Sequence, residues 1–188
     1  MKNISFHIRG VAPALMQCDR LANPLDPMAI ELKKLTSQRK KTEDVYRQIA
    51  ELEFRANLYW DKETGPYWPA QNIDAMMRSA GKMSKRGTDV MRALMCMNEK
   101  NPLIYDGPRD PAKMWGMNGT FVDMRSVVVQ RARTIRCRPI FRDWECKFDV
   151  AYDEEILNES VVKDIAVAAG RYIGLSMYRP RFGRFEVL

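Results

Sequence analysis

The chain has 188 residues, a length that suits one domain, or one domain with a large insertion, and that can bury a core without covalent staples. Its 31 basic and 24 acidic residues give a net charge of +7. No stretch approaches the roughly 20 apolar residues that span a bilayer, and the N-terminal segment is not typical of a signal peptide, so we expect a soluble intracellular protein that does not associate with membranes.

Four scattered cysteines form no C-x-x-C pair, and the single histidine, His7, leaves too few soft ligands for a zinc site. We therefore expect reduced thiols, no metal and no cofactor. The sequence also contains no Walker loop for phosphate, no G-x-S-x-G nucleophile elbow and no H-E-x-x-H helix. These absences favour a protein that is not an enzyme.

In the N-terminal two thirds of the chain, apolar and polar residues alternate over residues 4–9, which predicts a first strand ended by Gly10. A long helical pattern follows from about residue 28 to residue 59. Residues 64–70 are typical of a rigid loop, and Asn72 is a candidate cap for the next helix. Another helix is expected over residues 88–98, a short strand at residues 103–105 and a loop over residues 106–119.

In the C-terminal third, residues 127–138 are rich in β-branched residues and arginine, and Pro139 begins a plausible turn. Residues 144–152 then alternate strictly between apolar and mostly polar positions, so we expect the two runs to form an antiparallel hairpin. Asn158 is a candidate cap for a helix that ends at Gly174. A final strand is expected over residues 182–188.

In order, these elements predict an α+β protein with a ferredoxin-like or RRM-like βαββαβ core and an inserted helical region. Residues 1–24 and 120–188 would form the core. Residues 25–119 would form the mostly helical insertion within the same compact domain.

The positive charge is concentrated near the C-terminus, where residues 125–147 contain seven basic and two acidic residues and residues 171–184 contain four arginines and no acid. Guanidinium groups bind phosphate and stack on bases, and aromatic rings stack on the bases of single strands. Trp68 is a further candidate stacking residue. We therefore predict a nucleic-acid site at Lys82, Lys85, Arg86, Arg131, Arg133, Arg136, Arg138, Tyr178, Arg179, Arg181, Phe182, Gly183 and Arg184. The structural alternative is that Phe182 and Phe185 fill the core and that Arg181 or Arg184 pairs with carboxylates.

Two segments resemble the RAMP superfamily of CRISPR-associated proteins, particularly the crRNA-binding backbone subunits of effector complexes. Residues 67–80 (YWPAQNIDAMMRSA) are similar to a loop and helix of that family. Residues 173–185 (IGLSMYRPRFGRF) are similar to its glycine-rich loop, which precedes the last strand. The resemblance implies an RNA-binding RRM-like core and self-association through the inserted helical region.

The chain also resembles proteins of tailed phages and prophages that end in a similar segment, which implies action in the cytoplasm of a host bacterium. The leading hypothesis is a phage-encoded protein that binds single-stranded nucleic acid, RNA ahead of DNA, as a homo-oligomer along the strand. One alternative is a protein-interaction module, either an inhibitor that mimics a host CRISPR effector subunit or a phage assembly factor. A second is a ribonuclease that uses His7 as a general acid or base.

Overall fold

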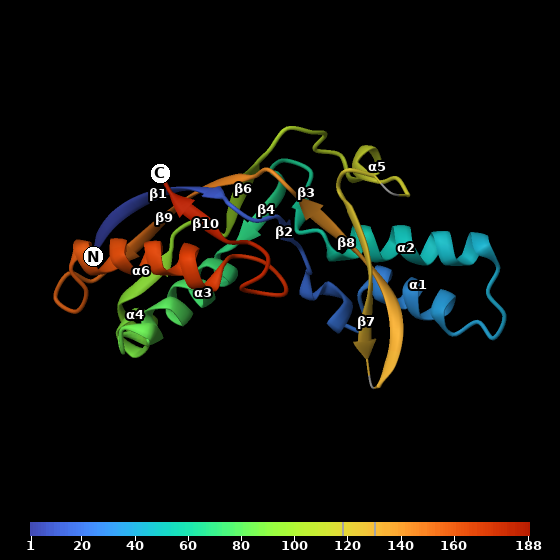
Figure 1. Ribbon diagram of the computed structural model, residues 1–188, viewed down its shortest axis with the longest axis horizontal. Coiled ribbons are helices and arrows are strands. Elements are labelled where there is room, and N and C mark those ends of the chain that lie inside the picture. Colours follow the sequence, from blue (N-terminus) through green and yellow to red (C-terminus); the bar gives the residue numbers. More distant parts are fainter. Residues whose placement is uncertain (118, 130) are drawn as a thin grey trace. The chain divides into compact units, whose positions relative to one another are not determined.

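The computed structural model describes residues 1–117, 119–129 and 131–188 (Figure 1). The chain divides into two compact units, each built from discontinuous segments. Unit 1 comprises Met1–Ala14, Trp60–Asp106 and Phe141–Leu188, and unit 2 comprises Leu15–Tyr59 and Gly107–Ile140. Residues 60–106, which the sequence places in the helical insertion, therefore belong to the same unit as the first and last strands.

The protein is an α+β protein with two antiparallel sheets, as its sequence predicts. The larger sheet has the strand order β10-β1-β9-β6-β4-β3, with β5 also paired to β9. Its strands are β1 (Lys2–Gly10), β3 (Trp60–Asp61), β4 (Gly65–Pro69), β5 (Leu94–Cys96), β6 (Lys100–Ile104), β9 (Glu145–Tyr152) and β10 (Phe185–Val187). The helices of unit 1 are α3 (Ala70–Met83), α4 (Gly87–Ala93), α6 (Glu159–Ala168) and the π-helical turn η2 (Ala169–Ile173).

The alternating patterns at both ends of the chain produce the centre of this sheet. Strands β1 and β9 pair along the whole of β9, from Lys2 opposite Tyr152 to Arg9 opposite Glu145. The apolar residues Phe6, Ile8, Phe148 and Val150 are buried, and helices α3 and α6 lie on the same face of the sheet (Figure 1). The core of unit 1 therefore lies between one sheet face and these helices.

Helix α6 and the π-helical turn η2 together begin and end at the residues that the sequence predicts. The Asn158 side chain accepts a hydrogen bond from the Val161 N–H at 2.9 Å, as an N-cap residue does. The helix continues into η2 and stops at Gly174, whose φ of +83° favours glycine. Both predictions for this helix are confirmed.

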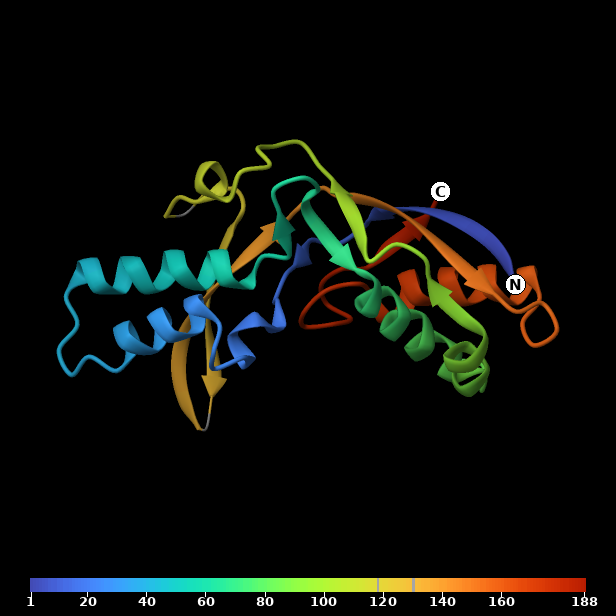
Figure 2. The ribbon, with the colours of Figure 1, turned by 180° about the vertical axis from the view of Figure 1, so that it is seen from behind.

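Unit 2 combines a helical pair with the second sheet, whose order is β2-β8-β7 (Figure 2). Its elements are β2 (Ala14–Leu15), η1 (Asp19–Ala22), α1 (Pro27–Thr36), α2 (Glu43–Asn57), α5 (Pro111–Met114), β7 (Val122–Val129) and β8 (Ala132–Phe141). The single long helix expected over residues 28–59 is thus two helices. Thr42 caps the second one, because its hydroxyl accepts the Val45 N–H.

The predicted pairing of residues 127–138 with residues 144–152 is wrong. The expected strand is divided between two strands, because residues 127–129 belong to β7 and residues 132–138 to β8. Strand β8 pairs with β7, from Val122 opposite Pro139 to Val129 opposite Ala132, whereas β9 belongs to the other sheet. Pro139 lies inside β8 instead of starting a turn, and its carbonyl oxygen accepts the Met16 N–H at 3.0 Å. A proline can occupy this strand because it still supplies an acceptor.

Three further predictions are wrong in detail. Residues 65–69 form strand β4 instead of a loop, because they pair with β3 and β6. Helix α3 starts at Ala70, with Pro69 as its N-cap residue, so Asn72 does not cap it. The helix expected over residues 88–98 ends at Ala93, where β5 pairs with the last residues of β9.

Candidate nucleic-acid interface

The C-terminal segment of unit 1 forms a closed loop, here called the tail loop (residues 174–184). The Leu175 N–H donates to the Gly183 carbonyl at 2.8 Å, which closes the loop on itself. The Gly183 N–H donates to the Pro13 carbonyl, also at 2.8 Å, which holds the loop against the chain after β1. Gly183 has a φ of +74°, and a methyl group on it would overlap Leu175 and Ser176. This position therefore requires glycine.

The rings of the tail loop divide between anchoring and exposure. Phe182 and Phe185 are buried in the core of unit 1. Phe182, which the sequence predicts to stack on bases, therefore anchors the loop to the core and is not exposed to a ligand. Tyr178 is 39% exposed and has a φ of +56°, a conformation that is uncommon for a bulky residue.

The three arginines of the tail loop are all exposed. Arg179, Arg181 and Arg184 form no ion pair with any carboxylate of residues 1–117, 119–129 and 131–188. The Arg184 carbonyl accepts the Val11 and Ala12 N–H groups at 2.8 and 3.2 Å, so its backbone is fixed while its side chain remains at the surface. An anchored loop thus carries three exposed arginines and one exposed aromatic ring.

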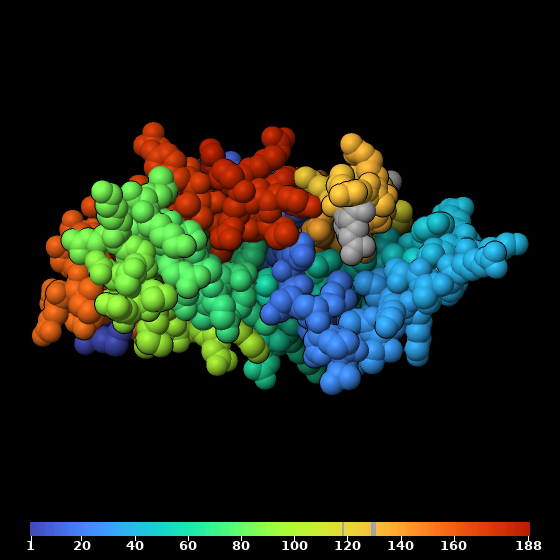
Figure 3. All heavy atoms as spheres, turned by 90° about the horizontal axis from the view of Figure 1, so that it is seen from below, coloured from blue at the N-terminus to red at the C-terminus, as the bar shows by residue number. Residues whose placement is uncertain are grey.

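The end of helix α3 and the turn before α4 carry the predicted basic residues, Lys82 on the helix and Lys85 and Arg86 in the turn, all exposed. Lys82 and Lys85 line a surface depression of about 430 Å³ together with Arg78. Arg86 differs, because it pairs with Asp89 at 3.1 Å. Helix α3 packs against η2, which leads into the tail loop. Figure 3 shows the C-terminal segment, in red, on the same face of unit 1 as the green helices.

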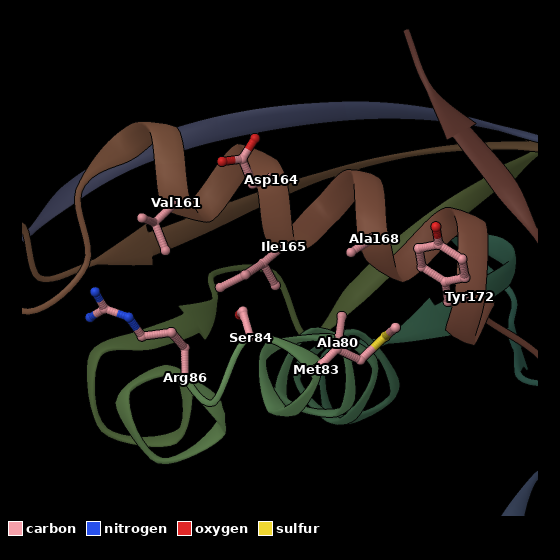
Figure 4. Close-up of a pocket in the computed structure, with 9 residues that line it drawn as sticks. All are labelled: Ala80, Met83, Ser84, Arg86, Val161, Asp164, Ile165, Ala168 and Tyr172. Atoms are coloured by element: carbon pink, nitrogen blue, oxygen red, sulfur yellow. The ribbon is translucent and has the colours of Figure 1, made fainter.

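A second groove of unit 1, of about 380 Å³, lies between α3–α4 and α6–η2 (Figure 4). Arg86, Asp164 and Val161 lie toward one end, and Met83 and Tyr172 lie toward the other. The groove is mainly apolar and carries one charge of each sign at its mouth. It is therefore less suited to phosphate than the tail loop.

The four predicted hairpin arginines belong to unit 2 and fall into two pairs. Arg131, at the turn with a φ of +68°, and Arg133 are exposed. Arg136 forms an ion pair with the buried Glu53, and the Nε of the buried Arg138 donates to the Gln17 side chain at 3.1 Å. The latter two arginines hold β8 in place, so only the first two are available to a ligand.

The remaining candidates have structural partners. Trp68 is 1% exposed and packs edge-on against Trp144, so the prediction that it stacks on bases is wrong. His7 Nε2 lies 2.6 Å from Glu145 Oε2, and Arg9 Nε donates to the same carboxylate at 2.8 Å. Arg9 first and His7 second lower the pKa of Glu145. His7 is therefore part of a side-chain network on the sheet, in which Arg9 forms the ion pair with Glu145.

In the part of the chain that the structure describes, no three His, Cys, Asp or Glu side chains are arranged to hold a metal ion. The same residues include no helix that is both long and apolar enough to cross a membrane.

Sequence reasoning missed a groove of about 620 Å³ in unit 2, between α2 and the hairpin. Of its lining residues, only Arg133 and Arg136 were candidates from the sequence. The exposed Tyr46, which also lines it, lies in a helix whose balanced charges are typical of a solvated surface. Its position in the helical register, three and four residues before the apolar Ile49 and Ala50, was the available signal.

No protein-family model matches this chain, and a search of curated proteins finds no match to it.

Proposed function

We propose that the protein binds single-stranded nucleic acid without catalysing a reaction. The observation that carries the proposal is the tail loop, on which Arg179, Arg181 and Arg184 are exposed and lack carboxylate partners among the described residues. Unpaired guanidinium groups bind phosphates strongly, because no intramolecular ion pair has to be broken first. The exposed Tyr178 adds a surface on which an unstacked base can lie.

The open face of the sheet is a weaker candidate. On β1 and β9 it carries acidic groups, including Glu145 and Asp149, which bind His7, Arg9 and Ser5. RRM domains bind RNA through aromatic residues on this face. The charges observed here instead favour the tail loop and the exposed basic residues at the end of α3 and in the turn that follows it.

We also infer a ferredoxin-like core within unit 1. The elements β1, α3, β5 with β6, β9, α6 and β10 follow one another as βαββαβ, and the strand order β10-β1-β9 followed by β5 and β6 is antiparallel throughout. This order, together with the tail loop, supports the resemblance to RAMP proteins. That resemblance is the reason for placing RNA ahead of DNA, for expecting a homo-oligomer along the strand and, with the phage-like ending, for expecting action in bacterial cytoplasm.

The test is fluorescence anisotropy of labelled single strands of about 30 nucleotides at several salt concentrations. For single strands the slope of log affinity against log salt is about −0.7 per phosphate contact, so replacing Arg179, Arg181 and Arg184 by alanine should make the slope shallower by about 2. The matched control replaces Lys2, Lys100 and Lys163 by glutamine. It removes the same charge, but each of these lysines is paired with a carboxylate.

A salt-independent signal would contradict the proposal, and so would equal losses in the tail-loop and control variants. A preference for duplex over single strands would contradict the role given to Tyr178. His7→Ala should bind single strands as the unmodified protein does. Neither protein should cleave RNA.

A protein-interaction module is the second candidate, and the groove of Figure 4 favours it. Met83 and Tyr172 are 55% and 47% exposed at this groove, which an apolar side chain of a partner could fill. Such a partner should survive nuclease treatment in a pull-down and should be lost with Met83→Asp. If Met83→Asp changes no protein interaction, this candidate is rejected.

A further inference from the structure

The groove of about 620 Å³ in unit 2 has the size of a small-ligand site. It lies between helix α2 and strand β8, which hydrogen bonds join at its base. The Glu53 side chain accepts the Cys137 N–H at 2.8 Å, and the Asn57 side chain donates to the Cys137 carbonyl at 3.3 Å. The walls of the groove are therefore fixed to each other.

Large apolar side chains are exposed on both walls. On α2, Tyr46 is 60% exposed and lies on the same helix face as Ile49 and Ala50. On the hairpin, Met124 and Ile135 are 38% and 56% exposed. Exposed apolar groups that gather at one concave site are typical of a binding surface. A planar ring could lie against Tyr46 with aliphatic side chains across from it.

The charge at this groove is positive. Lys41 and Arg133 line it and form no ion pair with the carboxylates that the structure describes. Among the described lining residues, Glu53 is the one acid, and its charge is balanced by Arg136. Lys41 already donates to the Gln38 carbonyl at 2.8 Å and has further protons to donate. The site therefore combines an aromatic platform with two cations.

We propose that this groove binds one nucleotide, with its base on Tyr46 and its phosphate at Lys41 and Arg133. An aromatic ring carrying an anion is the chemistry that satisfies both sets of residues, since an uncharged aromatic ligand would leave the cations unused. The nucleotide is either free or part of a strand. In the second case the inference rests on the proposed function, to which it adds a base-binding site outside the tail loop.

Photo-cross-linking with 5-iodouridine tests the proposal. One arm uses 5-iodouridine 5′-monophosphate, and the other uses an oligouridylate of about 10 nucleotides with one 5-iodouridine. Trypsin cleaves after Lys41 and Arg47, so the peptide of residues 42–47 contains Tyr46 and no other aromatic residue. We expect the cross-link in this peptide. Binding at this site should weaken about 5- to 140-fold in Tyr46→Ala, the range expected for loss of one stacked base, and should be kept in Tyr46→Phe.

The phosphate contact has its own control. Arg133→Gln should lower the cross-linking yield with 5-iodouridine 5′-monophosphate more than the yield with the nucleoside 5-iodouridine. Arg55→Gln should change neither yield, because Arg55 lies on α2, the helix of Tyr46, but outside the groove. A cross-link from the free nucleotide, from the strand or from both supports the site and identifies its source. If strands still bind by anisotropy but neither arm labels residues 42–47, the groove is not a nucleotide site and the proposed function stands. If the monophosphate labels this peptide but strands do not bind, the proposed function fails and the groove remains.

Discussion

Glu53→Ala should destabilise the junction between α2 and β8 more than any other single carboxylate deletion on this helix. Glu53 is 2% exposed, and one of its oxygens accepts the Cys137 N–H at 2.8 Å while the other pairs with Arg136. Removing it leaves a buried N–H without its acceptor, which costs about 1–3 kcal/mol, and removes a charge-assisted bond worth about 1.5–3 kcal/mol. Because the Arg136 side chain is 36% exposed and can recover some hydration, we expect a total of about 2–4 kcal/mol.

Thiol labelling of Cys137 measures this loss at the junction itself. Cys137 is 1% exposed, so it reacts only when the junction opens, and the labelling rate follows the free energy of opening. A loss of about 2–4 kcal/mol raises that rate about 30- to 700-fold after correction for the rate of the unfolded protein. Mass spectrometry of the peptide containing Cys137 separates it from the other cysteines.

Glu51→Ala is the matched control. Glu51 lies on the same helix, is about half exposed and approaches Arg55 only at 3.9 Å, so its removal should cost less than about 0.5 kcal/mol. If Glu53→Ala labels within twofold of Glu51→Ala, the ion pair contributes nothing at this position and the argument from burial is refuted.

Three more predictions follow from individual side chains. Gly183→Ala should lower stability by at least about 1–2 kcal/mol and weaken strand binding, because its φ of +74° is unfavourable for alanine; Gly116→Ala, with nothing within 4 Å, is the control in thermal unfolding. Burial raises the pKa of the half-buried Cys18 and raises the pKa values of the buried Cys137 and Cys146 to about 12, so iodoacetamide at pH 8 should alkylate the more accessible Cys18 first, and equal rates would contradict this. The Lys100 ammonium, followed by the Thr64 N–H, lowers the pKa of Asp61 from 3.8 to about 2. The contribution of the Asp61 carboxylate to stability is therefore present above pH 3.8 and lost as the pH falls through about 2. An NMR titration of Asp61 should show a midpoint at about 2, and Lys100→Gln should raise this midpoint toward 3.8.

The sequence predicts those elements whose stability depends on local periodicity and caps. Strand β9 is an example, because Cys146, Phe148, Val150 and Tyr152, together with Trp144 just before the strand, are all buried, as their spacing indicates. Helix α6 is another, because Asn158 and Gly174 define its ends by their own chemistry. Both features depend on residues within a few positions of each other, which a single sequence contains.

The pairing of strands that are distant in sequence could not be predicted from local periodicity and caps. Residues 127–138 have the composition of one strand, yet residues 127–129 belong to β7 and residues 132–138 to β8, and nothing in the composition indicates that the two parts pair with each other instead of with β9. The decisive contacts are long-range: Glu53 accepts the Cys137 N–H, and Met16 donates to Pro139. These contacts attach β8 to α2 and β2, so a proline that locally favours a turn is held within a strand.

The same distinction explains which predicted site residues remain candidates. Arginine content alone treats Arg133, Arg136 and Arg138 as equivalent, yet only Arg133 is exposed without an ion pair to the described carboxylates, because the buried Glu53 pairs with Arg136 and Gln17 with Arg138. The availability of a cation depends on partners that are distant in sequence. Charge density therefore overestimates how many hairpin arginines a ligand can contact. It is a better guide in the tail loop, where residues 171–184 contain no acid and the three arginines remain unpaired with any described carboxylate. Single substitutions of Arg179, Arg181 and Arg184 should therefore lower the affinity for single strands without loss of stability. Substitutions of Arg136 and Arg138 should instead lower the stability of the fold first.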